Sequence, residues 1–130
     1  MLADEKTDAT VQLWAEEQVA WLDRGYALPT AVPVTVQGIR LGQRVRLVGL
    51  EGEGVAELGQ LILAFYGEGI TFPLGYTNGT QLYLPTSAML EEGGYEVVSY
   101  YEYRKPAPLA KGIEDILKNG LRQLHDRGIE

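Results

Sequence analysis

Three oxygen-bearing side chains stand out in this sequence because of the residues around them: Glu53, Tyr83 and Tyr95. Glu53 lies in VGLEGEGVAELG, where an apolar run gives way to a helical pattern. Open α/β sheets bind ligands at such transitions, where backbone N–H groups point outward. A carboxylate there could serve as a hard oxygen ligand for a cation. The alternative is that Glu53 only complements the helix dipole, an effect of roughly 0.3 to 1 kcal/mol.

The two tyrosines occupy a segment rich in turn residues, GYTNGTQLYLPTSAMLEEGGYE, and lie twelve positions apart. Tyr83 stands between an Asn-Gly pair and a Pro-Thr pair, so its phenol could be held toward a cleft. A phenol with a pKa of about 10 binds a metal well only if the cation displaces or strongly polarises its proton. Tyr95 follows a Gly-Gly pair, and its hydroxyl could donate to developing negative charge. Ordinary packing remains the alternative interpretation for both tyrosines.

The other reactive residue types indicate no second site. His125 is the one histidine and lies near the end of the last helical pattern, where a cation complements the helix dipole. Ser87 and Ser99 are the two serines, and neither lies in a GxSxG elbow. The absence of cysteine excludes disulfides, thiolate nucleophiles and cysteine-bound zinc. GEGVAELG also lacks the lysine and hydroxyl residue of a Walker loop.

Helical and strand patterns alternate around these residues. Apolar residues at helical spacing predict helices over residues 7–24, 54–66 and 109–124. Thr7 or Asp8 is available as the N-cap of the first helix, with Gly25 just past its end. Alternating valines predict a strand from residue 32, followed by a tight turn and a second strand, RVRLVGL. The continuous apolar end of RVRLVGL predicts a central strand covered on both faces.

The second half of the chain predicts two more strands. GITFPLGYTNG reads as a strand parallel to RVRLVGL across a helical crossover. A short turn or helix over residues 85–92, capped by Thr86 and Ser87, precedes YEVVSYYEY. The β-branched and aromatic residues of YEVVSYYEY predict a strand over residues 95–103. We therefore expect a single α/β domain over residues 1–130, with a mixed sheet packed against about three amphipathic helices.

Composition narrows the classes of function. A chain of 130 residues with 45% hydrophobic and 22% charged residues is typical of one soluble globular domain. Eighteen acidic against eleven basic residues give a net charge of −7, which opposes binding to nucleic acid and to anionic membranes. The sequence shows no signal peptide and no transmembrane segment. The compartment stays open, because a longer parent protein could carry a leader.

Together these motifs resemble the C-terminal part of the catalytic domain of the neutral/alkaline non-lysosomal ceramidases and bacterial ceramidase-like proteins. The resemblance covers most of residues 8–124 and is carried by VGLEGE with VAELG, by GYTNG, by YLPT and by GGYE. Glu51 stands where related sequences often have proline or a small residue, and Leu82 replaces the usual glycine before the YLPT tyrosine. Members of this family are zinc-dependent amidases that hydrolyse the N-acyl bond of ceramide.

The resemblance implies roles for the three residues. It assigns Glu53 and Tyr83 as zinc ligands, and Tyr95 as a hydrogen-bond donor to the oxyanion that forms when water attacks the amide. No residue matches the two zinc-binding histidines and the active-site serine of the family's upstream segments. We therefore expect half of a zinc site, which binds zinc weakly in the isolated chain and hydrolyses nothing.

Two kinds of partner remain possible at this stage. One is the upstream half of a ceramidase-like domain, which would complete the site for a lipid-like N-acyl amide substrate. The other belongs to a non-enzymatic interaction or assembly module, such as a homodimer. Exposed aromatic surface around Tyr100, Tyr101 and Tyr103 would favour the module.

Overall fold

A three-stranded mixed sheet forms the centre of the computed structural model, which describes residues 5–130 and the side chains of residues 9–130. Its strands are β1 (Val36–Gly42), β2 (Val45–Leu50) and β4 (Ile70–Leu74), in the order β1-β2-β4. β1 pairs with β2 as an antiparallel hairpin, and β4 runs parallel to β2. The α/β fold with a mixed sheet is therefore confirmed.

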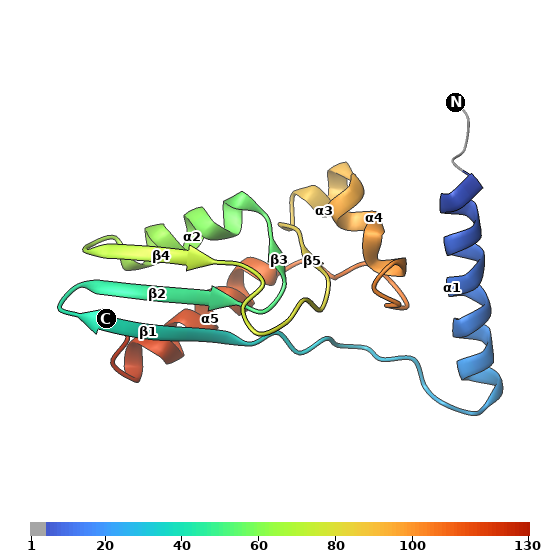
Figure 1. Cartoon of the computed structure of the whole chain (residues 1–130), viewed down its shortest axis with the longest axis horizontal. Helices are drawn as coiled ribbons and strands as arrows, with labels where there is room; N and C mark the ends of the chain where they lie inside the picture. Colours follow the sequence, from blue (N-terminus) through green and yellow to red (C-terminus); the bar gives the residue numbers. More distant parts are fainter. Residues whose placement is uncertain (1–4) are drawn as a thin grey trace.

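Two helices cover one face of this sheet, namely α2 (Ala56–Tyr66) and α5 (Ile113–Asp126) (Figure 1). α2 contacts β4, α5 contacts β1, and the helices contact each other. The core between sheet and helices consists of Val48, Leu50, Leu58, Ile62, Leu82, Leu84, Leu117 and Leu121. A Cβ on Gly120 would lie 3.3 Å from Val36 Cγ2, so this glycine lets α5 approach β1 closely. That packing offsets the roughly 1 kcal/mol by which glycine disfavours a helix.

The other face of the sheet is open. Val48 and Leu50 of β2 are buried beneath the helices, whereas Val45 and Leu47 are only half-buried. No helix or strand of residues 5–130 lies over this second face (Figure 1). The prediction that the central strand is covered on both faces is therefore wrong. Only its end at Gly49 is covered, by the side chain of Thr77.

Helix α1 (Glu5–Asp23) stands at one end of the molecule, apart from the sheet (Figure 1). Its Trp14 Nε1 donates to the carbonyl oxygen of Lys105 at 2.8 Å, and the Trp14 ring meets Tyr100 edge-on at 5.8 Å. The helix ends before Gly25 (φ 81°), as predicted, but it begins ahead of the predicted N-caps Thr7 and Asp8. Within the described residues, no helix combines the length and apolar character needed to cross a membrane.

The segment between α1 and β1 is extended but lies outside the ladder, so the first strand begins at Val36 and not at residue 32. Val32 and Val34 still pack against the core. Their alternating pattern therefore reflects burial against α5 and the sheet edge, without strand pairing. An alternating pattern reports which side chains are buried, and it does not by itself require a hydrogen-bonded neighbour.

The predicted strand over residues 95–103 is wrong. These residues form the short helix α4 (Tyr95–Val98) and the 3-10 helix η1 (Ser99–Tyr101), after the predicted short helix α3 (Met89–Glu92). Gly93 (φ 82°) and Gly94 (φ 111°) turn the chain sharply, and Val97 N then donates to Gly94 O. Helical turns bury Val97 and Ser99, and this packing outweighs the β-propensity of the segment.

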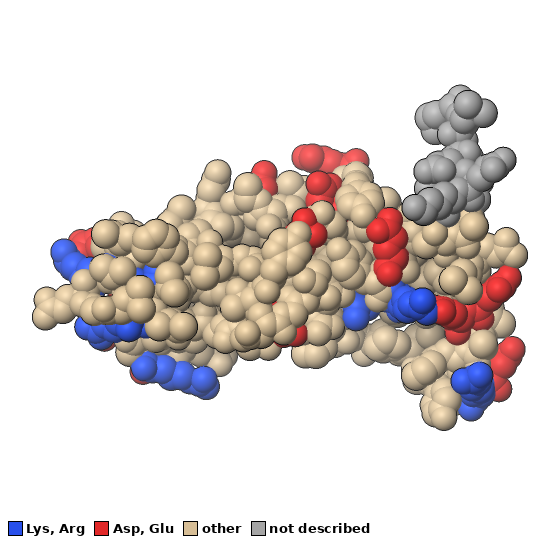
Figure 2. All heavy atoms as spheres, in the orientation of Figure 1, with Lys and Arg blue, Asp and Glu red and all other residues tan. Residues whose placement is uncertain are grey.

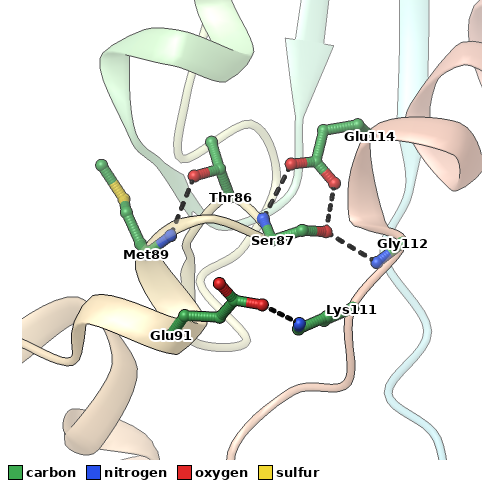
Figure 3. A network of polar contacts seen from close by, with 7 residues as sticks. All are labelled: Thr86, Ser87, Met89, Glu91, Lys111, Gly112 and Glu114. Atoms are coloured by element: carbon green, nitrogen blue, oxygen red, sulfur yellow. Dashed lines mark hydrogen bonds and ion pairs between the residues drawn. The ribbon is translucent and has the colours of Figure 1, made fainter.

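A polar network ties the segment after Tyr83 to the start of α5 (Figure 3). Ser87 Oγ donates to Glu114 Oε2 at 2.6 Å, and Ser87 N donates to Glu114 Oε1 at 2.7 Å. Ser87 Oγ also accepts a hydrogen bond from Gly112 N at 2.8 Å. Thr86 Oγ1 accepts from Met89 N at 3.3 Å, as its predicted capping role requires, whereas Ser87 serves this network instead.

Ser87→Ala is expected to lower the free energy of unfolding by about 1 to 2 kcal/mol at neutral pH, because Glu114 and Gly112 lose their partner. Two hydrogen bonds hold the pKa of Glu114 below its usual 4.5, the larger effect coming from the Ser87 hydroxyl and the smaller from the Ser87 N–H. This stabilisation is present above pH 4.5 and is lost as the pH falls through the lower folded-state pKa. Urea denaturation at neutral and acidic pH measures both effects, with exposed Thr80→Ala as control. If Ser87→Ala lowered the free energy of unfolding equally at both pH values, the role of Ser87 in stabilising the ionised Glu114 would be contradicted.

Candidate functional site

Glu53 and Tyr83 lie side by side at the end of the sheet. They belong to β3 (Glu53–Gly54) and β5 (Tyr83–Leu84), a two-residue parallel pair in which Glu53 is the register partner of Tyr83. Glu53 N donates to Leu82 O at 3.2 Å, and Val55 N donates to Leu84 O at 3.3 Å. Successive strand residues alternate between faces, so paired residues of parallel strands share a face. The two side chains therefore point to the same side.

A glycine turn and two leucines fix this pair in place. Gly52 has a φ of 133° and leads β2 directly into β3. A Cβ there would lie 3.2 Å from Leu82 O, so a larger residue would push β5 away from β3. Leu82 and Leu84 are buried in the core on either side of Tyr83. Leu82 is therefore turned into the core and anchors β5.

Tyr76 is a third member of the site. Its N–H donates to Gly52 O at 2.8 Å, and its φ of 56° is unusual for a bulky residue. Its phenol hydrogen-bonds to the Glu53 carboxylate, which raises the pKa of Tyr76 to about 12. The same carboxylate raises the pKa of Tyr83, again chiefly through a hydrogen bond. Both phenols are thus protonated donors to Glu53 at neutral pH.

Two further tyrosines surround Tyr83 with their rings. The ring of Tyr95 meets that of Tyr83 at 5.5 Å and 75°, and the ring of Tyr103 does so at 6.2 Å and 83°. The Tyr95 hydroxyl donates to Glu102 Oε2 at 2.9 Å, and this bond raises the pKa of Tyr95. We refer to Glu53, Tyr76, Tyr83, Tyr95 and Tyr103 as the Glu53–tyrosine cluster.

The three residues singled out in the sequence thus lie together. Tyr95 joins the cluster through its ring, while its hydroxyl binds Glu102 and not Glu53. Sequence reasoning missed Tyr76 and Tyr103. Tyr76 was accessible to it, since GYTNG places this residue two positions before an Asn-Gly turn. Tyr103 was hidden because a strand over residues 95–103 would not have returned its ring to Tyr83.

Glu51 lies near the cluster but has a structural role. Its carboxylate accepts hydrogen bonds from Thr35 N and Gln81 Nε2, each at 3.0 Å. These bonds, led by that from Thr35, lower the pKa of Glu51. A Cβ on Gly79 would lie 2.9 Å from Glu51 Oε1, so Gly79 makes room for this carboxylate. Glu51 therefore joins the segment before β1 to the loop that carries Tyr76.

Glu53 and Tyr83 bring two oxygen atoms together, which is fewer ligands than a catalytic zinc site uses. Catalytic zinc usually has about three protein ligands, commonly histidine nitrogens and carboxylates. In the part of the chain that the structure describes, no group of three or more His, Cys, Asp or Glu side chains could hold a metal ion. His125 lies on α5 in a separate pocket lined by arginines, with its Nδ1 3.9 Å from Asp126 Oδ1. It is the exposed helix-end residue that the sequence predicts.

Comparison with known proteins identifies no relative: no protein-family model, no curated protein and no solved structure matches this chain.

Glu53→Gln is expected to lower the pKa of Tyr76 from about 12 toward its usual 10.0, because the negative acceptor is removed. A raised tyrosine pKa stabilises the fold below the unfolded-state value of 10.0, and that stabilisation is lost as the pH rises through about 12. The substitution should therefore flatten the alkaline fall in stability. Ultraviolet absorbance titration, with Tyr76→Phe to assign the signal, measures the shift.

Glu57→Gln is the matched control, because Glu57 is exposed in the first turn of α2. An unchanged tyrosine titration in Glu53→Gln, or an equal shift in Glu57→Gln, would contradict the role of Glu53 in the cluster.

Proposed function

We propose that this chain forms one wall of a zinc-dependent amidase site for lipid-like N-acyl amides of the ceramide type. Glu53 and Tyr83 are the two oxygen ligands that the chain contributes. The nitrogen ligands come from a histidine-bearing polypeptide equivalent to the upstream half of a ceramidase-like domain. The observation that carries this proposal is the register of β3 and β5, which sets Glu53 beside Tyr83 on one face.

The electrostatics of the cluster suit a cation that arrives with further ligands. A bound zinc ion would polarise the amide carbonyl and lower the pKa of its water toward about 7. In the chain alone, the Glu53 carboxylate is already shared by the phenols of Tyr76 and Tyr83. A cation beside Glu53 opposes their raised pKa values, because positive charge favours the phenolate. Histidine ligands held by another polypeptide supply the affinity that two oxygens lack.

Two tyrosines of the cluster offer hydroxyl donors for an oxyanion. Tyr95 is 52% exposed, so its hydroxyl can leave Glu102 and rotate toward a substrate carbonyl beside Tyr83. Tyr76 is 57% exposed and already directs its hydroxyl toward Glu53. A phenol with a raised pKa stays protonated at neutral pH and can donate to negative charge on an amide oxygen.

An assembly module is the second candidate function, and a different surface favours it. The tyrosines at positions 100, 101 and 103 are half-buried, so they do not form the exposed aromatic surface that would have favoured a module. The open face of the sheet instead exposes Ile39, Ile70 and Phe72. An apolar sheet face without a cover is typical of a surface that packs against another polypeptide.

Zinc titration tests the amidase proposal. Calorimetry of the chain alone is expected to show weak binding and no hydrolysis of an N-acyl sphingosine. Addition of a histidine-containing polypeptide that corresponds to the upstream half of a ceramidase-like domain should give tight zinc binding and turnover. In that mixture, Glu53→Gln and Tyr83→Phe should each weaken zinc binding at least about tenfold.

The matched controls are Glu57→Gln and Tyr26→Phe, two exposed residues outside the cluster. Both should bind zinc and turn over substrate like the unmodified chain. A reconstituted pair that neither binds zinc nor hydrolyses the amide would sink the proposal, and so would equal losses in the control variants.

A further inference from the structure

Helix α1 meets the rest of the molecule at residues 99–105, which comprise η1 and the turn after it and which we call the Tyr103 turn. Trp14 Nε1 donates to Lys105 O at 2.8 Å, and the Trp14 ring meets the Tyr100 ring edge-on at 5.8 Å. Lys105 N donates to Tyr100 O at 3.0 Å, which closes the turn. One side chain of α1 thus contacts both ends of the Tyr103 turn.

The backbone of the Tyr103 turn is strained at Arg104. Arg104 N donates to Tyr101 O, and together with the bond from Lys105 N this forms the Schellman motif that ends many helices. Glycine usually occupies the left-handed position of this motif, but here Arg104 adopts it with a φ of 57°. A strained residue of this kind persists where the surrounding structure holds it in place. The Glu17 carboxylate of α1 forms an ion pair with Arg104, and Figure 2 shows a basic and an acidic group side by side at this boundary.

The Tyr103 turn also carries two side chains that contact the Glu53–tyrosine cluster. The Tyr103 ring packs edge-on against that of Tyr83 at 6.2 Å. Glu102 Oε2 accepts the hydrogen bond from the Tyr95 hydroxyl at 2.9 Å. Because Glu102 and Tyr103 directly precede Arg104, a change in the backbone of the turn displaces both side chains. The turn therefore connects the contacts made by α1 with those made by the cluster.

Little apolar burial holds α1 in place. Five of its large apolar side chains are between 37% and 56% exposed, namely Val11, Leu13, Val19, Trp21 and Leu22. Side chains that remain in water add little to the free energy of docking. The linker over residues 26–35 forms neither helix nor strand. Elements with few buried contacts open locally at a lower free energy than the core, so α1 can leave the Tyr103 turn while the sheet and its helices stay folded.

We infer that α1 is a conformational clamp on the Glu53–tyrosine cluster, with Trp14 as its positioning residue. When α1 is docked, the Tyr103 turn keeps Tyr103 against Tyr83 and Glu102 within reach of Tyr95. When α1 is released, the turn relaxes and both contacts loosen. The effect of the clamp on amide hydrolysis rests on the proposed function. The clamp itself is tested in the chain without zinc, so it and the proposed function can fail separately.

Amide hydrogen exchange measured by NMR tests the clamp. Trp14→Phe keeps an aromatic ring against Tyr100 but removes the donor to Lys105 O. The hydrogen-bonded amides of the Tyr103 turn, at positions 102, 104 and 105, should then exchange at least about fivefold faster, as expected for the loss of one hydrogen bond. The amides of β2 and α2 should exchange at unchanged rates, because these elements belong to the core.

The Tyr95 hydroxyl gives a second readout, which lies in the cluster itself. Its hydrogen bond to Glu102 raises the pKa of Tyr95, so Trp14→Phe should lower this pKa toward the usual 10.0. NMR titration of isotope-labelled tyrosine measures the change, with Tyr95→Phe to assign the signal. Tyr66 of α2, whose pKa is raised chiefly by burial, is an internal reference that should titrate as before.

Trp21→Phe is the matched control, because Trp21 also lies on α1 but donates its indole hydrogen bond to Ala27 O in the linker, at 3.1 Å. Glu17→Gln removes the ion pair with Arg104 and should change both readouts in the same direction as Trp14→Phe. Unchanged exchange and unchanged Tyr95 titration in Trp14→Phe and Glu17→Gln would overturn the clamp, and so would equal changes in Trp21→Phe. Faster exchange throughout β2 and α2 would also overturn it, because the substitution would then act on the whole fold.

Discussion

The parallel pairing of Glu53 with Tyr83 is the contact on which the arrangement of the cluster depends. It exists because β2 is followed by Gly52, whose conformation turns the chain toward β5 without a side chain between them. The loop after β4 uses the same turn, since Tyr76 N donates to Gly52 O. The Glu53 carboxylate thereby contacts the phenols of Tyr76 and Tyr83, which come from separate segments. Substitution of Gly52 would disturb all three residues together, which loss of a single phenol would not.

Helices cover one face of the sheet and leave the other open, so the two faces contribute differently to the core. Buried leucines of β2, β5, α2 and α5 form the core and hold the backbone of the cluster. The opposite face contributes little to that core. Apolar side chains that remain in water gain none of the roughly 25 cal/mol per Å² that burial provides. Ile39 and Phe72, which are exposed, therefore contribute little to the stability of the fold.

The sequence predicted those elements in which local preference and burial agree. Helix α2 and the parallel pairing of β2 with β4 follow from apolar spacing and from a crossover of ordinary length. The prediction of a strand over residues 95–103 was wrong because β-branched and aromatic side chains also pack well on short helical turns. Tyr76 was missed because GYTNG indicates a turn near this residue but not that its phenol reaches Glu53. Whether one or both faces of the sheet are covered depends on tertiary packing, and the spacing of apolar residues along a strand does not predict it.

The Tyr83 phenol must lose or share its proton before its oxygen can bind a metal ion well. The hydrogen bond from this phenol to Glu53 raises its pKa, so the contact that positions the oxygen also opposes its ionisation. A cation must therefore overcome that shift before the phenolate can bind it. The free energy needed to deprotonate Tyr83 is offset when other ligands already hold the cation. The charge of the cation then acts on a phenol that is already in position. On the proposed function, such a cluster is well ordered yet binds metal poorly alone, and a partner must supply the further ligands.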